Sequence, residues 1–244
     1  MITLPPLGEL EDRLWLALME IAERRAGDWT LVGGQMVLLH ALEHGATPPR
    51  ISTDLDLVVD ARVRPPAIPA MAEVLDDLGF RLGGVAPDGV GHRFMRGPVT
   101  IDLLAPEGAG PRADLTVGGG AETVPIRGGT YALRRTQLVD VSAGGRVGRV
   151  PRPDLAGALV VKAAAARADR KRGPERHLGD LALLLSLVPD PFALRDELGA
   201  KNCGRIGAVS ALADDEHPAW LGLDIAARSN AKAAFTLITG HAVA

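Results

Sequence analysis

Aromatic residues and cysteine are both scarce in this chain of 244 residues. Aromatic residues make up 3% of the sequence, and the one cysteine is Cys203. A single cysteine excludes an internal disulfide, a CxxC pair and a cysteine-rich zinc site, so we interpret Cys203 as structural. Because so few aromatic rings are present, aromatic stacking cannot be the main means by which this chain holds a ligand.

Long apolar segments and a strong net charge are also missing. No uncharged apolar run approaches the roughly 18 residues that a bilayer-spanning helix needs, and residues 1–15 lack a basic segment followed by an apolar one. We therefore expect a cytoplasmic protein with no membrane partner. The net charge of -3 and the pI near 6.1 argue against general coating of nucleic acid, but both are compatible with a local basic patch.

The remaining composition is that of a globular protein with a sizeable core. Hydrophobic residues account for 47% of the chain and charged residues for 23%. Residues 1–150 mix strand and helix patterns, whereas residues 151–244 are rich in Ala and Leu at helical spacing. This predicts an α/β fold, with a small mixed sheet flanked by helices in residues 1–150 and an α-helical domain in residues 151–244 that closes a cleft.

A pair of glycines joins a predicted strand to a predicted helix. The strand covers residues 29–32, Gly33 and Gly34 form a turn, and the helix covers residues 35–43. Two residues without Cβ let the backbone approach a ligand closely, and the amides at the start of a helix point outward. This arrangement favours phosphate as the ligand. Neither GxxxxGK[ST] nor GxGxxG is present, so the chain is not predicted to be a P-loop or Rossmann protein.

Three aspartates supply negative charge. Asp54 and Asp56 are two residues apart at the start of a predicted strand, so both side chains leave the same face. Asp102 interrupts an apolar strand over residues 99–104, which a Gly-Pro turn joins to a strand over residues 92–96. Like charges this close are unfavourable unless a cation neutralises them, and paired carboxylates suit Mg2+. We therefore predict a magnesium site here; the alternative is a set of solvated carboxylates at strand edges.

Several short motifs follow one another between about residue 28 and residue 187. They are LVGGQMVLLHAL, RISTDLDL, VTID, the helical ALVVKAAAAR and finally RHLGDLALLL. In this order they resemble the nucleotidyltransferase superfamily that includes DNA polymerase β, and most of all its AbiEii-type and MenT-like toxins of type IV toxin–antitoxin systems. The resemblance implies a nucleotidyltransferase fold and transfer of a nucleotide from an NTP to a hydroxyl acceptor.

The resemblance also implies a role for each matching position in the first half. Gly33 and Gly34 would cradle the triphosphate, although many superfamily members have Ser at the second position and this chain has no hydroxyl there. Asp54 and Asp56 would bind Mg2+. Asp102 would complete the metal site and help to deprotonate the attacking hydroxyl.

Four further positions have both a functional and an ordinary interpretation. Arg50 and Ser52 precede the aspartates, where they could orient them or contact phosphate. Lys162 is one of only four lysines among 27 basic residues, and its compact ammonium suits the β- and γ-phosphates. Asp180 would contact the nucleotide or support the site. The ordinary interpretations are a lysine on a helix surface and an aspartate at a helix start.

A basic segment begins at Lys162. Residues 162–177 hold six Lys or Arg residues and two acidic residues. Such a local excess of positive charge suits a nucleic-acid backbone, although a solvated helix end and loop explains it equally well. The candidates for nucleic-acid contact are Arg167, Arg170, Lys171, Arg172 and Arg176.

The sequence thus predicts a Mg2+-dependent nucleotidyltransferase that uses an NTP. By resemblance to the toxins, the acceptor is the tRNA 3′ end and a cognate antitoxin is a possible partner. The alternatives are nucleotidylation of a small molecule such as an aminoglycoside, nucleotidylation of a protein, or a nucleotide-binding module without catalysis. We interpret His92 and Arg93, in the hairpin before Asp102, as ordinary strand polarity.

Overall fold

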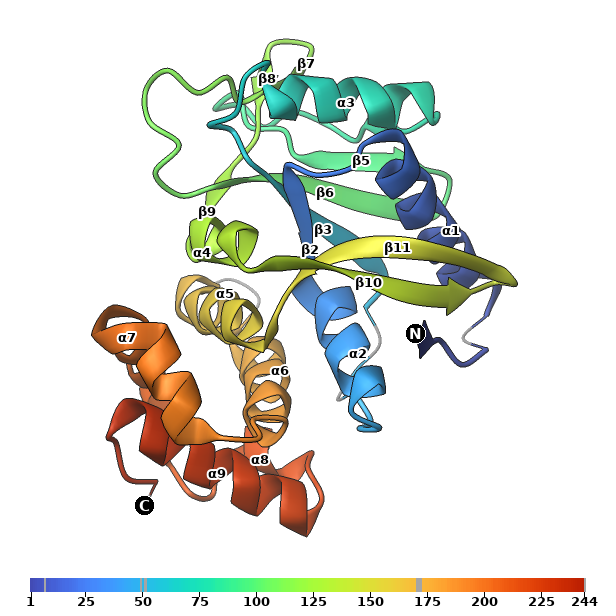
Figure 1. Cartoon of the computed structure of the whole chain (residues 1–244). Helices are drawn as coiled ribbons and strands as arrows, with labels where there is room; N and C mark the ends of the chain where they lie inside the picture. The colour runs from blue at the N-terminus through green and yellow to red at the C-terminus, as the bar shows by residue number, and fades with distance from the viewer. Residues whose placement is uncertain (7, 49, 51, 170–172, 244) are drawn as a thin grey trace.

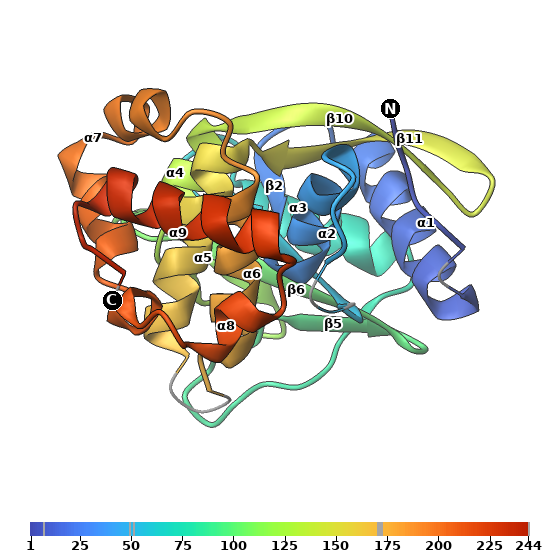
Figure 2. The ribbon, with the colours of Figure 1, turned by 90° about the horizontal axis from the view of Figure 1, so that it is seen from below.

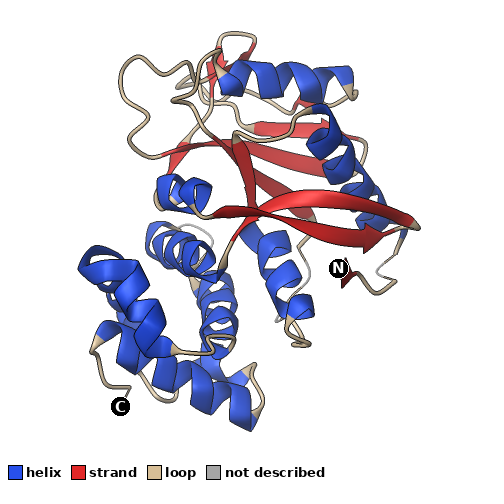
Figure 3. Ribbon diagram, viewed as in Figure 1, coloured by secondary structure: helices blue, strands red, loops and turns tan. Residues whose placement is uncertain are grey.

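The computed structural model describes residues 1–6, 8–48, 50, 52–169 and 173–243. It is a mixed α/β protein, as the sequence predicts. The strands gather in one part of the molecule, and the helices of the last third of the chain form the other part (Figure 1, Figure 3). None of the helices in the described ranges combines the length and apolar character needed to span a bilayer.

The main sheet consists of six strands. They are β2 (Trp29–Val32), β3 (Asp54–Val59), β4 (Arg81–Leu82), β5 (Arg93–Arg96), β6 (Val99–Pro106) and β9 (Pro125–Ile126). Along the sheet the order is β2-β3-β6-β5-β4, and β9 pairs with the end of β6. β3 and β6 run parallel to each other. The other pairs, β2 with β3, β5 with β6 and β4 with β5, are antiparallel. The sheet is therefore mixed, with β3 and β6 at its centre.

Burial along β2 and β6 explains why these two segments are almost entirely apolar. All four residues of β2 are buried, and β6 is buried over almost its whole length because β3 and β5 flank it on both sides. Asp102 is the one charged residue in β6. An acidic side chain in the centre of a sheet is expensive to bury without a partner, so its position points to a specific contact.

Two smaller sheets complete the strand inventory. β1 (Ile2–Thr3), β10 (Thr136–Ala143) and β11 (Arg146–Pro153) form the first, and β7 (Thr116–Gly118) and β8 (Ala121–Glu122) form the second. The long β10–β11 hairpin lies across the front of the molecule in Figure 1. The predicted division near residue 150 falls within the last strand of this hairpin, just before the helices of the second half.

Four helices belong to the first half. They are α1 (Glu9–Arg24), α2 (Gly33–Glu43), α3 (Ala67–Asp77) and α4 (Gly129–Arg134). The apolar stripe Leu14, Leu18 and Ile21 of α1 is fully buried, as its helical spacing predicts. α2 is buried from Gly34 to Ala41 because it packs against β3 on one side and against helices of the second half on the other.

After β11 ends at Pro153, the described residues of the second half form helices and the loops that connect them. Its elements are α5 (Leu155–Ala168), α6 (Glu175–Ser186), α7 (Pro191–Gly207), a 3-10 turn (Ser210–Ala213), α8 (Pro218–Leu221) and α9 (Ile225–Thr239). Asp154 caps α5 as predicted, because its side chain accepts a hydrogen bond from the Gly157 amide. α6 packs between α5 and α9, and the group lies beside α2 (Figure 2).

Candidate functional site

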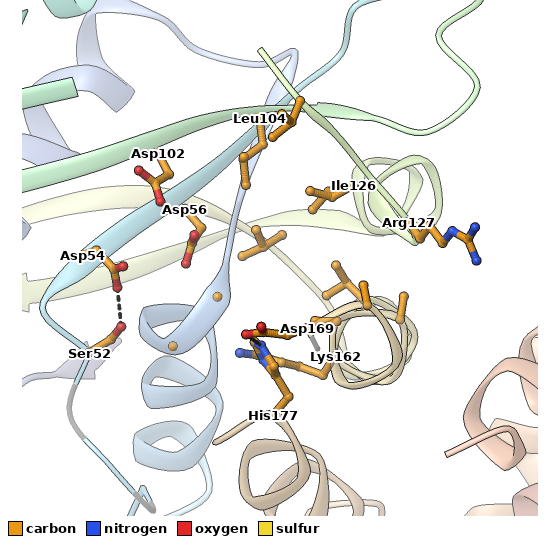
Figure 4. Close-up of a pocket in the computed structure, with 18 of the residues that line it drawn as sticks. Ser52, Asp54, Asp56, Asp102, Leu104, Ile126, Arg127, Lys162, Asp169 and His177 are labelled. Carbon is orange, nitrogen blue, oxygen red and sulfur yellow. Dashed lines mark hydrogen bonds and ion pairs between the residues drawn. The ribbon is translucent and has the colours of Figure 1, made fainter. Parts of the chain in front are cut away.

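A cavity of about 770 Å³ lies between the main sheet and the helices α5 and α6. This volume is typical of a site for a small organic ligand. Its walls come from both halves of the chain: the start of α2, β3, β5, β6 and the segment after β9 on one side, and α5 and the start of α6 on the other. Figure 4 shows the aspartates on the strands and the side chains of Lys162, Asp169 and His177 beside the helices.

One row of residues crosses the main sheet at this cavity. Asp56 on β3 is in register with Val32 on β2 and with Asp102 on β6, and Asp102 is in register with Arg93 on β5. Residues in register on neighbouring strands project from the same face. The topology therefore brings together two carboxylates from residues 46 positions apart, with the backbone of α2 beginning directly after Val32.

Gly33 is a residue of α2 rather than part of a separate turn, which corrects the prediction of a glycine turn before the helix. Its φ is +73°, a value that L side chains rarely adopt. A Cβ at this position would overlap the Asp56 carboxylate and lie 2.7 Å from its Cγ. The absence of a side chain thus lets the first turn of α2, whose amides have no partner within the helix, approach Asp56 closely.

Gly34 is surrounded by the two residues that precede the aspartates. A Cβ at Gly34 would lie 2.5 Å from Ser52 Cβ, 2.7 Å from Ser52 Oγ and 3.1 Å from a terminal nitrogen of Arg50. Ser52 Oγ donates a hydrogen bond of 2.7 Å to Asp54 Oδ1 (Figure 4). Ser52 therefore occupies the space that a side chain at position 34 would need.

The surroundings of Asp56 disfavour its ionised form. Burial, followed by the negative charges of Asp54 and Asp102, raises the pKa of Asp56 to about 7, against the opposing effect of Lys162 and Arg176. Carboxylates gathered in this way repel one another when all are ionised. A cation bound among them would relieve that repulsion.

Two of the three aspartates have the accessibility that a Mg2+ ligand needs. Asp54 and Asp56 line the cavity and are partly accessible, and they fit an oxygen-ligated cation. Asp102 is engaged differently, because both of its oxygens accept hydrogen bonds of 2.8 Å from Arg93. Within the described residues, no group of three or more His, Cys, Asp or Glu side chains is arranged to hold a metal ion. Asp54 and Asp56 would therefore be the first ligands, and Asp102 would join them only after displacing the guanidinium.

Lys162 and Asp180 form a buried ion pair. Lys162 Nζ lies 2.7 Å from Asp180 Oδ2, and the side chains are 2% and 1% exposed. Arg50 also donates to Asp180 Oδ2 at 2.9 Å, so one carboxylate holds cations from two distant parts of the chain. Lys162 is thus neither a surface lysine nor unpartnered. Asp180 does not line the cavity; it is a positioning residue behind Lys162 and Arg50.

Asp169 contacts two residues at the start of α6 that line the cavity, Arg176 and His177. Asp169 Oδ2 accepts a hydrogen bond of 2.8 Å from Arg176 and lies 3.4 Å from His177 Nε2. Burial, followed by the positive charges of Lys162 and Arg176, lowers the pKa of His177 to about 4. His177 is consequently neutral near pH 7 and can act there as a hydrogen-bonding group but not as a cation.

The arginines of the predicted basic segment do not all line the same cavity. Arg176 lines the cavity, whereas Arg167 lines a neighbouring pocket. The remaining three predicted candidates, Arg170, Lys171 and Arg172, lie outside the described residues.

Three charged residues that line the cavity were not predicted from the sequence, namely Arg93, Arg127 and Asp169. Arg93 lines the cavity and binds Asp102, which corrects its interpretation as ordinary strand polarity. The signal was available, because a two-residue turn at Gly97-Pro98 places Arg93 directly opposite Asp102. Arg127, after β9, also lines the cavity, and nothing in its local sequence distinguishes it from the many other arginines.

Binding of Mg2+ is expected to stabilise the protein more at about pH 8 than at about pH 6. Between its ordinary pKa and about 7, Asp56 keeps a proton in the folded protein that the unfolded chain has lost. The stability contributed by this group therefore falls as pH rises through that range, and a cation restores it once the carboxylate is ionised. Thermal unfolding with and without Mg2+ measures the effect. Asp56→Asn should remove the difference between the two pH values; an equal Mg2+ effect at both in the unmodified protein would contradict this prediction.

Comparison of the sequence with models of known protein families gives no match, and comparison with curated proteins gives none. The function must therefore be argued from the cavity itself.

Proposed function

We propose that this chain has a nucleotidyltransferase fold and is a Mg2+-dependent nucleotidyltransferase that moves a nucleotide from an NTP to a hydroxyl acceptor and releases pyrophosphate. One observation carries the proposal: Asp54 and Asp56 share a single cavity with the first turn of α2 and with Lys162. This combination offers carboxylates for a divalent cation and, beside them, backbone amides and an ammonium for phosphate.

The proposed placement of the triphosphate follows from these groups. The unpaired amides at the start of α2 donate to phosphate oxygens, and the two glycines keep side chains out of the way. Lys162 contributes a positive charge whose position is fixed by Asp180. Arg50 is 29% exposed and lines the cavity, so it can contact phosphate while it remains bound to Asp180.

The proposed reaction is an in-line displacement at the α-phosphorus. The acceptor oxygen forms a bond to the α-phosphorus while the bond to the oxygen that bridges to the β-phosphorus breaks, and pyrophosphate leaves with that electron pair. The hydroxyl proton passes to a carboxylate, for which we propose Asp102, held in a fixed orientation by Arg93. When bound at Asp54 and Asp56, Mg2+ would neutralise charge on the phosphates.

The acceptor that we propose is the 3′-terminal hydroxyl of tRNA, with a cognate antitoxin as protein partner. Both proposals rest on the resemblance of the motifs to the toxin branch of the superfamily. The basic residues of the cavity and the arginines of the neighbouring pocket support a polyanionic acceptor.

The decisive test is transfer of label to RNA. The purified protein is incubated with Mg2+, each labelled NTP in turn and total tRNA. Asp56→Asn is expected to lower the labelling rate by more than about 100-fold, the scale on which the loss of one preorganised charged group affects catalysis. Asp140→Asn is the matched control, because Asp140 is an exposed strand aspartate that lines neither this cavity nor the neighbouring pocket.

Other outcomes contradict parts of the proposal. Labelling of a small molecule or a protein, with none of RNA, would overturn the tRNA acceptor while leaving nucleotidyl transfer intact. Nucleotide binding without labelling of any acceptor would overturn the enzymatic proposal and favour a nucleotide-binding module.

A further inference from the structure

A second pocket, of about 560 Å³, adjoins the first cavity. The two share Arg127, Ala164 and Ala168 as walls, so the space beside the aspartates continues past α5. The charged residues of this pocket are Arg127, Arg167, Arg205 and Glu107. We call it the arginine pocket. It lies where the end of β6 and the segment after β9 meet α5 and α7, and therefore between the two halves of the chain.

The single carboxylate of the arginine pocket is largely committed to the backbone. Glu107 Oε1 accepts a hydrogen bond of 2.9 Å from the Gly128 amide, and its Oε2 accepts one of 3.0 Å from the Thr130 amide. Arg205 approaches Glu107 only to 3.7 Å. Within the described residues, Arg127 and Arg167 make no side-chain hydrogen bond or ion pair. Positive charge consequently remains available for a ligand.

Arg127 occupies a firmly held turn. Gly128, the next residue, has a φ of +85°, and a Cβ there would lie 3.0 Å from the Cα of Val161 and 3.2 Å from the carbonyl oxygen of Val160. The turn is thus packed directly on the backbone of α5 and is fixed from the other side by Glu107. In Figure 4 the Arg127 side chain points away from Asp54, Asp56 and Asp102. It extends from the first cavity toward the arginine pocket, which it also lines.

We infer that the arginine pocket binds a phosphodiester of the RNA acceptor, an inference that rests on the proposed function. Guanidinium groups bind phosphate through paired hydrogen bonds, and three arginines line this pocket with one carboxylate, both of whose oxygens already accept hydrogen bonds from backbone amides. The phosphates of the incoming nucleotide have separate proposed partners, the start of α2 and Lys162, which line the first cavity but not the arginine pocket. A strand held in the arginine pocket by a backbone phosphate can therefore place its terminal hydroxyl beside the aspartates. Arg127, which lines both spaces, joins the two subsites.

The experiment separates acceptor binding from nucleotide binding. Binding of a short, fluorescently labelled single-stranded RNA to the full-length protein is followed by anisotropy at several salt concentrations, and binding of ATP with Mg2+ by calorimetry. Arg127→Ala is the first variant, because Arg127 is exposed and its replacement removes no buried contact. Arg205→Lys is the second, because it keeps the charge and loses the planar fork. Arg149→Ala is the control: Arg149 is exposed on β11, which lines neither space.

Arg127→Ala is expected to raise the Kd for RNA about fivefold or more and to lower the slope of log Kd against log salt by about one. Arg205→Lys should weaken RNA binding with little change in that slope. ATP binding should be unchanged in Arg205→Lys and should change less than RNA binding in Arg127→Ala, because Arg127 also borders the first cavity. Arg149→Ala should bind both ligands normally. DNA of the same sequence should show the same losses, because a phosphate contact does not distinguish the two sugars.

Two results would overturn the inference. RNA binding equal to that of the unmodified protein would show that the arginine pocket holds no acceptor phosphate, and a loss confined to ATP would assign the pocket to the nucleotide. The inference and the proposed function fail separately, since the anisotropy measurement requires no transfer. RNA affinity that depends on Arg127 supports the pocket even if no RNA is labelled.

Discussion

Gly33→Ala is expected to reduce nucleotide transfer by about 100-fold or more, a loss typical of misplacing a catalytic group by about 1 Å. The new Cβ would overlap the Asp56 carboxylate, so either the aspartate or the start of α2 must move. Both groups belong to the proposed site, and Mg2+ affinity should fall together with the transfer rate. The measurements are the initial rate of tRNA labelling and the rise in unfolding temperature on addition of Mg2+.

Gly45→Ala distinguishes this overlap from backbone strain. Gly45 has a similar φ of +67°, yet a Cβ there would meet nothing within 4 Å. The substitution should therefore cost about 1 kcal/mol of stability through strain alone and leave Mg2+ binding and transfer unchanged. If Gly33→Ala lowered transfer no more than Gly45→Ala does, the close approach of α2 to Asp56 would have no functional role.

Asp180→Ala is expected to destabilise the fold by about 3–5 kcal/mol, the cost of leaving a buried charge without its partner. Lys162 is 2% exposed, and removal of Asp180 would leave its ammonium among other cations, including Arg50. Lys162→Met should cost less, because Asp180 then keeps Arg50 as a partner. Unfolding in urea measures both effects. Asp215→Ala, which breaks the more exposed Lys232–Asp215 pair, is the control and should cost about 0–1 kcal/mol.

The double variant Lys162→Met/Asp180→Leu separates stability from function. Replacing both charges with apolar side chains is expected to recover much of the lost stability, because no buried charge remains. Transfer should stay low, since the ammonium that faces the cavity is gone. Recovery of transfer together with stability would show that Lys162 and Asp180 have a purely structural role.

Predictions from the sequence are confirmed where one segment determines its own structure. β2 begins and ends where predicted, and the buried stripe of α1 and the cap at Asp154 follow from spacing and side-chain chemistry. The glycine pair was located correctly, but its conformation was not, because the positive φ of Gly33 depends on the contact with Asp56.

The partners of charged side chains could not be predicted in the same way. Lys162 and Asp180 were both singled out, but their burial and their ion pair depend on the packing of α5 against α6. Arg50 reaches Asp180 from 130 residues away in the sequence. Contacts between residues this far apart in the sequence depend on the whole fold, and the local periodicity of a segment carries no information about them.

The mixed α/β class and the approximate helices and strands follow from the amino-acid sequence, as does the choice of Gly33, Gly34, the aspartates and Lys162 as candidate site residues. The tertiary structure was needed to show that Asp56 and Asp102 lie in one row, that Arg93 binds Asp102, and that three arginines from separate segments line one pocket. The physical reason is that charge is a property of a residue, whereas its neutralisation depends on which side chains the fold brings within hydrogen-bonding distance.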